Sequence, residues 1–153
     1  MYDLAALLTE MRASIPLAQA MDLRGASYDG LTLCLQLPLA PNINDKGCAF
    51  GGSMASAATL TGWGLVRLAI GESGRAADIY IQDQSIQYLA PLWSDMQIRC
   101  SWSDESEKAA FLARYDRTGR ARASLEANVG PMTGEEAGAC RMQGRYVALR
   151  PSS

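Results

Sequence analysis

The apolar positions of the first third of the chain follow a helical period and then a strand period. Between residues 3 and 13, leucine and methionine recur at steps of three and four, which predicts an amphipathic helix that ends before Pro16. After a turn at 28–30, leucines alternate with other residues from 31 to 38. This spacing is typical of a strand with one buried face, and it closes a predicted hairpin.

Residues 52–70 are the most apolar stretch and contain one charged residue, Arg67. A helix that is apolar on every side is usually enclosed by the rest of the protein, so we expect a central, buried helix. A membrane span is the alternative. The stretch is shorter than about 20 apolar residues, is rich in glycine and ends near Arg67 and Glu72, so we expect no membrane segment.

The second half of the chain is rich in strands. Alternating patterns predict them at 79–89, 96–102, 120–129 and 141–149, with a turn at 130–134 before the last. These strands follow the buried helix, so the pattern favours a single antiparallel sheet.

One further helix interrupts these strands. The spacing of Phe111, Leu112 and Tyr115 predicts a helix over 105–117, with residues 103–105 as its cap and Gly119 as its end. The whole order is helix, two strands, buried helix and several strands. It predicts an α+β fold in which an antiparallel sheet wraps around a long central helix, as a single domain over residues 1–153.

Composition excludes several functions. The net charge is −2 and the sequence contains no basic cluster, so nucleic acid is not an expected partner. The beginning of the chain does not resemble a signal peptide, and the four cysteines form no C-x-x-C pair. We therefore expect a cytoplasmic protein with free thiols.

The absence of histidine removes the commonest general base and zinc ligand, and we expect no metal and no tightly bound cofactor.

Residues 42–53 form the candidate site. A polar loop runs there into Gly51 and Gly52, which open the buried helix. Glycines at a helix start let backbone N–H groups approach a ligand closely, and the helix dipole favours negative charge at that end. These features predict an oxyanion hole for the oxygen of an acyl thioester.

The loop also carries a recognisable pattern. Asn44-x-x-Gly47-x-x-Phe50-Gly51-Gly52 resembles the Asn-x-x-Gly-x-x-His-Gly-Gly signature of hotdog acyl-CoA thioesterases. Segments 39–47 and 49–53 resemble the family of the YiiD C-terminal thioesterase-like domain, and residues 88–91 fit the exit of the third strand in such folds. The resemblance covers the whole chain. It implies the hotdog fold, a substrate carried on coenzyme A or on the phosphopantetheine of acyl carrier protein, and a homodimer or dimer of dimers with pockets between subunits.

The sequence departs from the thioesterase pattern at two positions. Where the resemblance implies a carboxylate that activates water, this chain has Thr59, and Phe50 replaces the histidine. A threonine is a poor general base at neutral pH. Some YiiD-like proteins are malonyl-ACP decarboxylases that feed fatty acid biosynthesis. The resemblance therefore favours decarboxylation of malonyl-ACP or malonyl-CoA, with the Asn44 amide and the Gly52 N–H holding the enolate oxygen.

Besides the catalytic candidates Asn44, Gly52 and Thr59, further residues are expected to contact the substrate. These are Asp45, Phe50, Gly51, Ser53, Asp83 and Ser85. Hydrolysis of acyl-CoA with Asp83 or Asp45 as the base is one alternative function, and a non-catalytic module that binds acyl thioesters or a partner protein is another. Structural explanations also stay open: Asn44 as a loop cap, the glycines as packing residues, and Thr59 bonded to the preceding helical turn.

Overall fold

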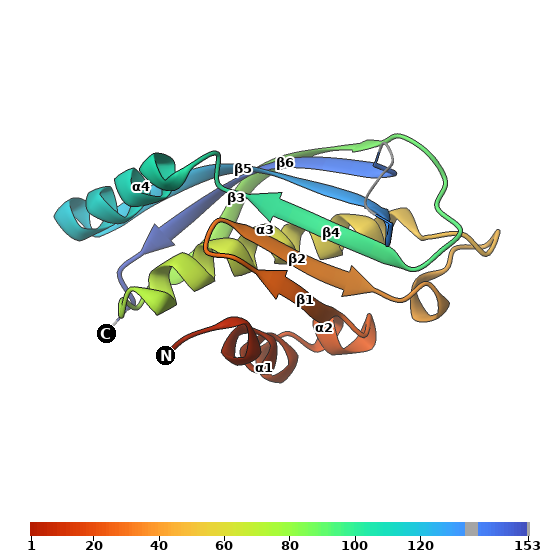
Figure 1. Cartoon of the computed structure of the whole chain (residues 1–153), viewed down its shortest axis with the longest axis horizontal. Helices are drawn as coiled ribbons and strands as arrows, with labels where there is room; N and C mark the ends of the chain where they lie inside the picture. Colours follow the sequence, from red (N-terminus) through yellow and green to blue (C-terminus); the bar gives the residue numbers. More distant parts are fainter. Residues whose placement is uncertain (134–137, 153) are drawn as a thin grey trace.

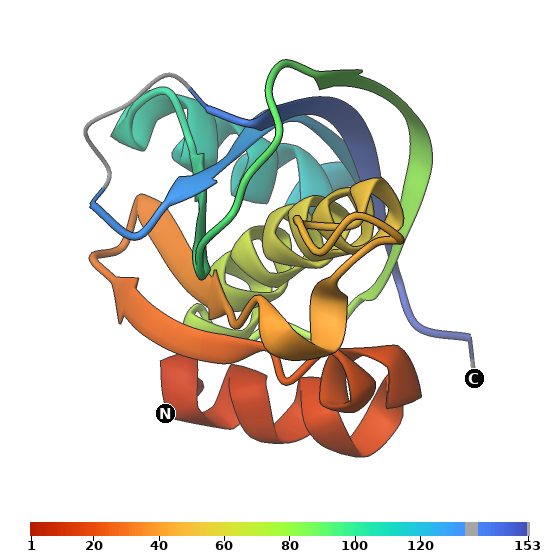
Figure 2. The ribbon, with the colours of Figure 1, turned by 90° about the vertical axis from the view of Figure 1, so that its right-hand side faces the viewer.

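The computed structural model describes residues 1–133 and 138–152, and its centre is one long helix inside a curved sheet (Figure 1). The helix is α3 (Gly51–Glu72). The six strands are β1 (Arg24–Tyr28), β2 (Thr32–Leu37), β3 (Asp78–Tyr88), β4 (Met96–Ser101), β5 (Arg120–Pro131) and β6 (Cys140–Leu149). They form an antiparallel sheet in the order β1-β2-β4-β5-β6-β3. The end-on view shows the sheet curving around α3 (Figure 2). The predicted hotdog arrangement is confirmed.

The other helices lie at the margins of the sheet. They are α1 (Leu4–Ser14), α2 (Pro16–Ala20), the 3-10 helix η1 (Ala40–Asn42) and α4 (Glu105–Thr118). The sequence analysis did not predict α2 or η1, although Pro16 and Pro41 occupy the early helical positions where a missing N–H costs little. The strand predicted to end at 129 continues to Pro131, and Gly134 of the predicted turn lies outside the described residues. No helix in the described ranges is long and apolar enough to span a bilayer.

The prediction of a cap and a stop for α4 is confirmed. Asp104 is the N-cap, and its carboxylate accepts a hydrogen bond from the Glu107 N–H at 2.8 Å. The Glu107 carboxylate in turn accepts from the N–H of Ser103, the residue before the N-cap, at 2.6 Å, which resembles a capping box shifted by one residue. Gly119 ends the helix with φ +73°, a left-handed conformation that favours glycine. The chain therefore turns sharply from α4 into β5.

Close packing against β6 fixes α3 inside the sheet. The Tyr146 side chain is fully buried, and its hydroxyl donates to the Thr59 carbonyl at 2.8 Å. Burial raises the pKa of Tyr146 well above its ordinary value, so the hydroxyl stays a donor. The tyrosine ring fits because residue 62 is glycine: a Cβ there would lie 2.2 Å from the Tyr146 hydroxyl oxygen.

A β-bulge in the edge strand β3 decides which side chains face α3. Pairing with β6 shifts register between Ile81 and Asp83. Ile81 pairs with the inward-facing Tyr146, whereas Asp83 pairs with the exposed Arg145. Before the bulge the odd-numbered residues of β3 face the helix, and after it the even-numbered ones do.

Gly62→Ala should destabilise the protein. The added methyl group would overlap the buried Tyr146 ring, and overpacking costs roughly 1–3 kcal/mol, more than the approximately 1 kcal/mol that alanine gains in helix propensity. Thermal or urea unfolding measures the decrease in the free energy of unfolding. Gly64→Ala is the matched control, because its Cβ would meet only the flexible ends of Leu33, Met11 and Leu7, at 3.0–3.1 Å. Equal stability of the two variants would contradict this account.

Candidate active site

The loop between η1 and α3 is anchored at its base by Asn42. This buried side chain donates from Nδ2 to the carbonyls of Met21, at 3.0 Å, and Pro38, at 2.8 Å. The Asn42 carbonyl accepts from the Phe50 N–H at 2.8 Å, and Ile43 forms an isolated bridge with Ala49. The loop is therefore held closed against the start of α3.

The Asn44 side chain organises the tip of this loop. Its Oδ1 accepts from the backbone N–H groups of Lys46, at 2.8 Å, and Cys48, at 3.2 Å. These two donors fix the orientation of the amide, and Nδ2 then donates to Cys48 Sγ at 3.1 Å. A primary amide carries two N–H hydrogens, so one remains beyond the bond to sulfur. Asn44 thus acts as the loop cap that the sequence left open as an alternative, and it still has a donor to offer.

The first turn of α3 presents further donors. Phe50 is the N-cap and makes no side-chain capping bond, so the N–H groups of Gly51, Gly52 and Ser53 have no acceptor within the helix. Aromatic rings cover both glycines. A Cβ on Gly52 would lie 2.4 Å from the Phe50 ring, and one on Gly51 would lie 3.1 Å from the Tyr88 ring. The start of α3 therefore combines free backbone N–H groups and the positive end of the helix dipole with two aromatic rings.

A groove of about 420 Å³ joins the loop to this helix start. Its lining residues are Asn44, Lys46, Cys48, Ala49, Gly51, Met54, Tyr88, Leu89, Ala90 and Pro91. Among these there is one charged side chain, the cation Lys46, and no carboxylate. The groove therefore offers hydrogen-bond donors and apolar surface. It offers no evident general base.

The structure brings together several of the predicted residues. Asn44 and Gly51 line the groove, while Phe50, Gly52 and Ser53 form the helix start beside it. Asp45 is exposed and paired with Lys46, with 3.0 Å between Oδ1 and Nζ, and it does not line the groove.

Thr59 lies farther along α3. It is seven residues beyond Gly52, roughly 10 Å along the helix axis, and does not line the groove. Its Oγ1 lies 2.8 Å from the Ala55 carbonyl, the back-bond to the preceding turn, and 2.9 Å from Gln84 Oε1 on β3. Both neighbours are neutral. In one chain, Thr59 is therefore separated from Asn44.

The structure places Asp83 and Ser85 apart from the groove. Both were expected to contact the substrate, but the bulge in β3 turns them to the outer face of the sheet, away from α3. There Asp83 forms an ion pair with Arg145. Hydrogen bonding to this guanidinium holds the pKa of Asp83 below its ordinary value, which makes the carboxylate a weaker base. Neither residue is part of the groove.

Lys46 and Cys48 lie within the predicted segment 42–53, although they were not named as site residues, whereas Met54 in the groove and Gln84 beside Thr59 were missed. A signal for Gln84 was available. In β3 the large apolar residues change from odd numbers, Ile79 and Ile81, to even ones, Ile86 and Tyr88. Such a change of parity indicates a bulge, and the bulge gives residue 84 the inward face.

Residues 1–133 and 138–152 contain no candidate metal site, because no three histidine, cysteine or acidic side chains lie close enough together to hold a metal ion. The described thiols are free and buried, and burial raises the pKa of Cys100 to about 12.

Comparison with known proteins gives a consistent result. The family described as "Putative thioesterase (yiiD_Cterm)" matches residues 4–150. A solved structure of a protein of unknown function from Chlorobaculum tepidum is 35% identical, with 96% of this chain and 94% of that chain covered and a TM-score of 0.89. A "putative thioesterase" from Shewanella oneidensis is 30% identical over 95% of this chain and 96% of that one, with a TM-score of 0.85.

Proposed function

Since this chain belongs to the yiiD C-terminal family of thioesterase-like proteins, we propose that it is an acyl-thioester enzyme that decarboxylates malonyl-ACP or malonyl-CoA to the acetyl thioester. One observation supports this choice over hydrolysis. The groove gathers hydrogen-bond donors at a helix start, and its lining includes no carboxylate or histidine. Such a site stabilises a negative oxygen without removing a proton.

The reaction requires those donors at one atom. The bond between C2 of the malonyl group and its carboxylate carbon breaks, and CO2 leaves. The electron pair of that bond moves into the thioester carbonyl, whose oxygen becomes the negative oxygen of an enolate. A proton from water then adds at C2 to give the acetyl thioester. The step therefore needs an oxyanion hole and a substrate held with the breaking bond perpendicular to the thioester plane.

The chain supplies the oxyanion hole from two elements. The second N–H of Asn44 Nδ2 comes from the loop, and the Gly52 N–H comes from the uncapped helix start. The bond to Cys48 Sγ and the two backbone bonds to Oδ1 hold the Asn44 amide in one orientation. Donors that are already oriented need no rearrangement as charge develops, and each is worth about 2.7–4 kcal/mol in comparable sites.

The surroundings favour loss of CO2. Apolar groove residues such as Met54, Leu89 and Pro91 would replace part of the water around the malonyl carboxylate, which favours the neutral product.

Hydrolysis is the second candidate, because the description of the matched family is "Putative thioesterase (yiiD_Cterm)". Its difficulty is the base. Asp83 lies on the outer face of the sheet and Asp45 is exposed beside Lys46. A carboxylate from another source would have to activate the water.

We also propose that the protein is a homodimer in which two β3 strands pair edge to edge. In the described chain β3 pairs on one side, with β6, so its other edge is open. Tyr80 and Tyr88 on this strand are 55% and 57% exposed, and Phe50 beside it is 53% exposed. An open strand edge flanked by exposed aromatic side chains favours pairing with another strand. In the arrangement that the family resemblance implies, Thr59 and Gln84 of one copy would face Asn44 of the other.

The decarboxylation is tested with the wild-type protein and two Asn44 variants. Wild type should convert malonyl-ACP or malonyl-CoA into the acetyl thioester without releasing free thiol, as read by mass spectrometry and a colorimetric thiol reagent. Asn44→Asp keeps the Oδ1 acceptor that holds the loop but loses the amide donor. We expect it to unfold near the wild-type temperature and to lose roughly 100-fold or more in turnover.

Asn44→Ala is the comparison variant, because it should lose turnover and loop stability together. Free thiol from the wild type would indicate hydrolysis instead. Full turnover by Asn44→Asp would show that the Asn44 amide is not the donor, and no product from any substrate would favour the acyl-binding module.

Thr59→Asp should create hydrolysis where the wild type has little. The carboxylate would stand next to Gln84, whose amide can hold it ionised, and in the proposed dimer it would supply a base to the groove of the other copy. Release of free thiol from acetyl-CoA measures the gain. Thr59→Asn has nearly the same shape and no base, so it should stay inactive as a hydrolase. A folded Thr59→Asp variant without any gain would contradict the role assigned to this position.

The dimer is tested by mass and by protection of β3. Light scattering should give twice the 16.4 kDa of one chain. The β3 amides should exchange slowly with deuterium, since a paired edge leaves no N–H open to water. A single-chain mass, or fast exchange along the outer edge of β3, would rule out the proposed pairing.

A further inference from the structure

Five arginines gather at one end of the molecule, and none of them forms an ion pair within residues 1–133 and 138–152. Seven of the 14 lysine and arginine side chains lie within 4 Å of a carboxylate in the described chain. Of the seven that do not, five lie where α4 passes into β5 and the C-terminal segment runs beside it. We call them the arginine surface: Arg114, Arg117, Arg120, Arg122 and Arg150.

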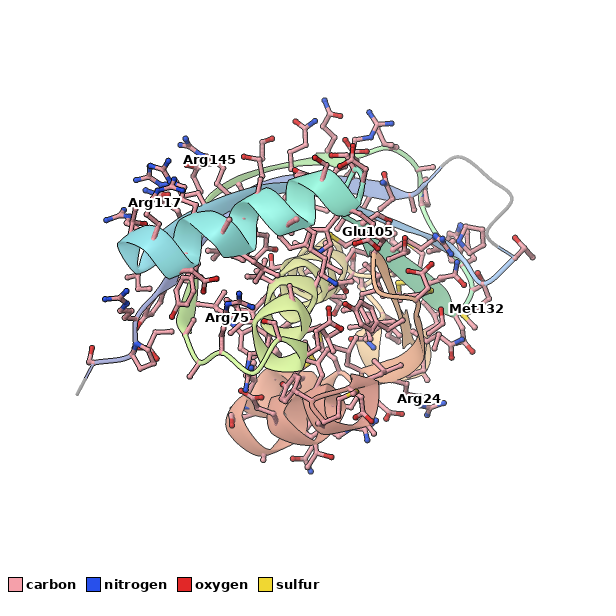
Figure 3. The ribbon with its side chains drawn as sticks, turned by 60° about the vertical axis from the view of Figure 1, so that its left-hand side comes forward. Arg24, Arg75, Glu105, Arg117, Met132 and Arg145 are labelled. Atoms are coloured by element: carbon pink, nitrogen blue, oxygen red, sulfur yellow. The ribbon has the colours of Figure 1, made fainter. Side chains whose placement is uncertain are left out.

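The turn at Gly119 creates this surface. Arg114 and Arg117 lie one turn apart on α4, and Arg120 and Arg122 follow on the outward face of β5. Arg150 packs over the glycine, where a Cβ would lie 2.8 Å from its Nε. The sequence shows no basic cluster as a run of residues, yet the fold assembles one. Figure 3 shows Arg117 at the end of α4, pointing away from the ribbon.

Neighbouring groups leave the positive charge uncompensated. Asp116, the nearest acid on α4, is already held by Arg75, with 2.6 Å between Nε and Oδ1. The Arg122 Nε donates to a neutral group, Gln82 Oε1, at 3.0 Å. Arg114, Arg120 and Arg122 line a shallow groove of about 370 Å³. Like charges held this close repel each other, so the fold gains nothing from leaving them unpaired.

We propose that the arginine surface docks the acidic face of the carrier protein that delivers the thioester, an inference that rests on the proposed function. The four arginines of α4 and β5 form two pairs, each spaced by about 5–7 Å, which matches carboxylates one turn apart on an acidic helix. A single phosphate would need only one such group. A nucleic acid would favour a chain of positive net charge, and this chain carries −2. Guanidinium groups bind carboxylates in a bidentate way, which suits a specific protein contact.

The strand register relates this surface to the groove. Arg120 and Asp78 both pair with Leu149, so the surface lies at the Asp78 end of β3. The groove lies at the Tyr88 end. Antiparallel pairing of two β3 edges brings the Asp78 end of one subunit beside the Tyr88 end of the other. A carrier docked on one subunit would therefore deliver its thioester to the groove of the second.

The test compares two charge reversals of equal size. Arg114→Glu/Arg117→Glu changes the exposed side of α4 and leaves the strand pairing intact. Arg12→Glu/Arg99→Glu changes the two unpaired arginines outside the surface. Calorimetry with acetyl-loaded carrier protein measures binding without any turnover. We expect the surface variant to weaken binding by roughly tenfold or more and the control by less than about twofold, with wild-type affinity falling as salt rises.

A second readout separates docking from catalysis. The kcat/KM for malonyl-CoA should be the same in the surface variant and the wild type, because coenzyme A bypasses the docking contact. Unchanged carrier affinity in the surface variant would overturn the proposal, as would an equal loss with malonyl-CoA or tighter binding of wild type to a short RNA than to the carrier. Carrier binding that depends on these arginines, in a protein that decarboxylates nothing, would support the docking surface and contradict the proposed function.

Discussion

The start of α3 is a helix end whose backbone donors find no acceptor in the described chain. In many helices the side chain of the N-cap residue accepts a hydrogen bond from one of these N–H groups. The N-cap of α3 is Phe50, whose side chain has no acceptor. The rest of α3 is enclosed by the sheet and fixed by Tyr146 against Gly62, so the open end cannot fray without disturbing the core. The protein therefore keeps a rigid cluster of N–H groups at its surface, where an anionic oxygen is the natural acceptor.

The loop that faces this helix start depends on one side chain for two tasks. The Asn44 Oδ1 accepts hydrogen bonds from the loop backbone, and one Nδ2 hydrogen is donated to Cys48 Sγ. The second Nδ2 hydrogen is left as a donor in a fixed direction. A residue that only capped the loop would need no amide nitrogen. Serine or aspartate would cap such a turn as well. Asparagine differs from these two residues by its amide nitrogen, which here donates to Cys48 Sγ and keeps a second N–H.

Periodicity predicted nearly all of the sheet and the helices, because α3 is apolar on all sides and β5 alternates without interruption. The double glycine and Asn44 indicated the position of the loop groove for the same reason: their conformational and hydrogen-bonding properties are local. The sequence could not show what depends on pairing between distant segments. The outward position of Asp83 follows from a bulge in its pairing with β6, and the arginine surface follows from the Gly119 turn and from the capture of Asp116 by Arg75.

The bulge at Gln82 has a wider consequence. The bulge sets which side chains of β3 lie on each face: Ile79, Ile81, Gln84 and Ile86 lie toward the helix, and Asp83 and Ser85 are among those that lie toward the outside. If the second half of the strand slipped by a single position, Asp83 and Ser85 would turn toward Thr59 and Ile86 would turn toward water. The packing of Ile86 against the core thus fixes the register of the second half of β3, and with it the side of the sheet on which Asp83 and Ser85 lie.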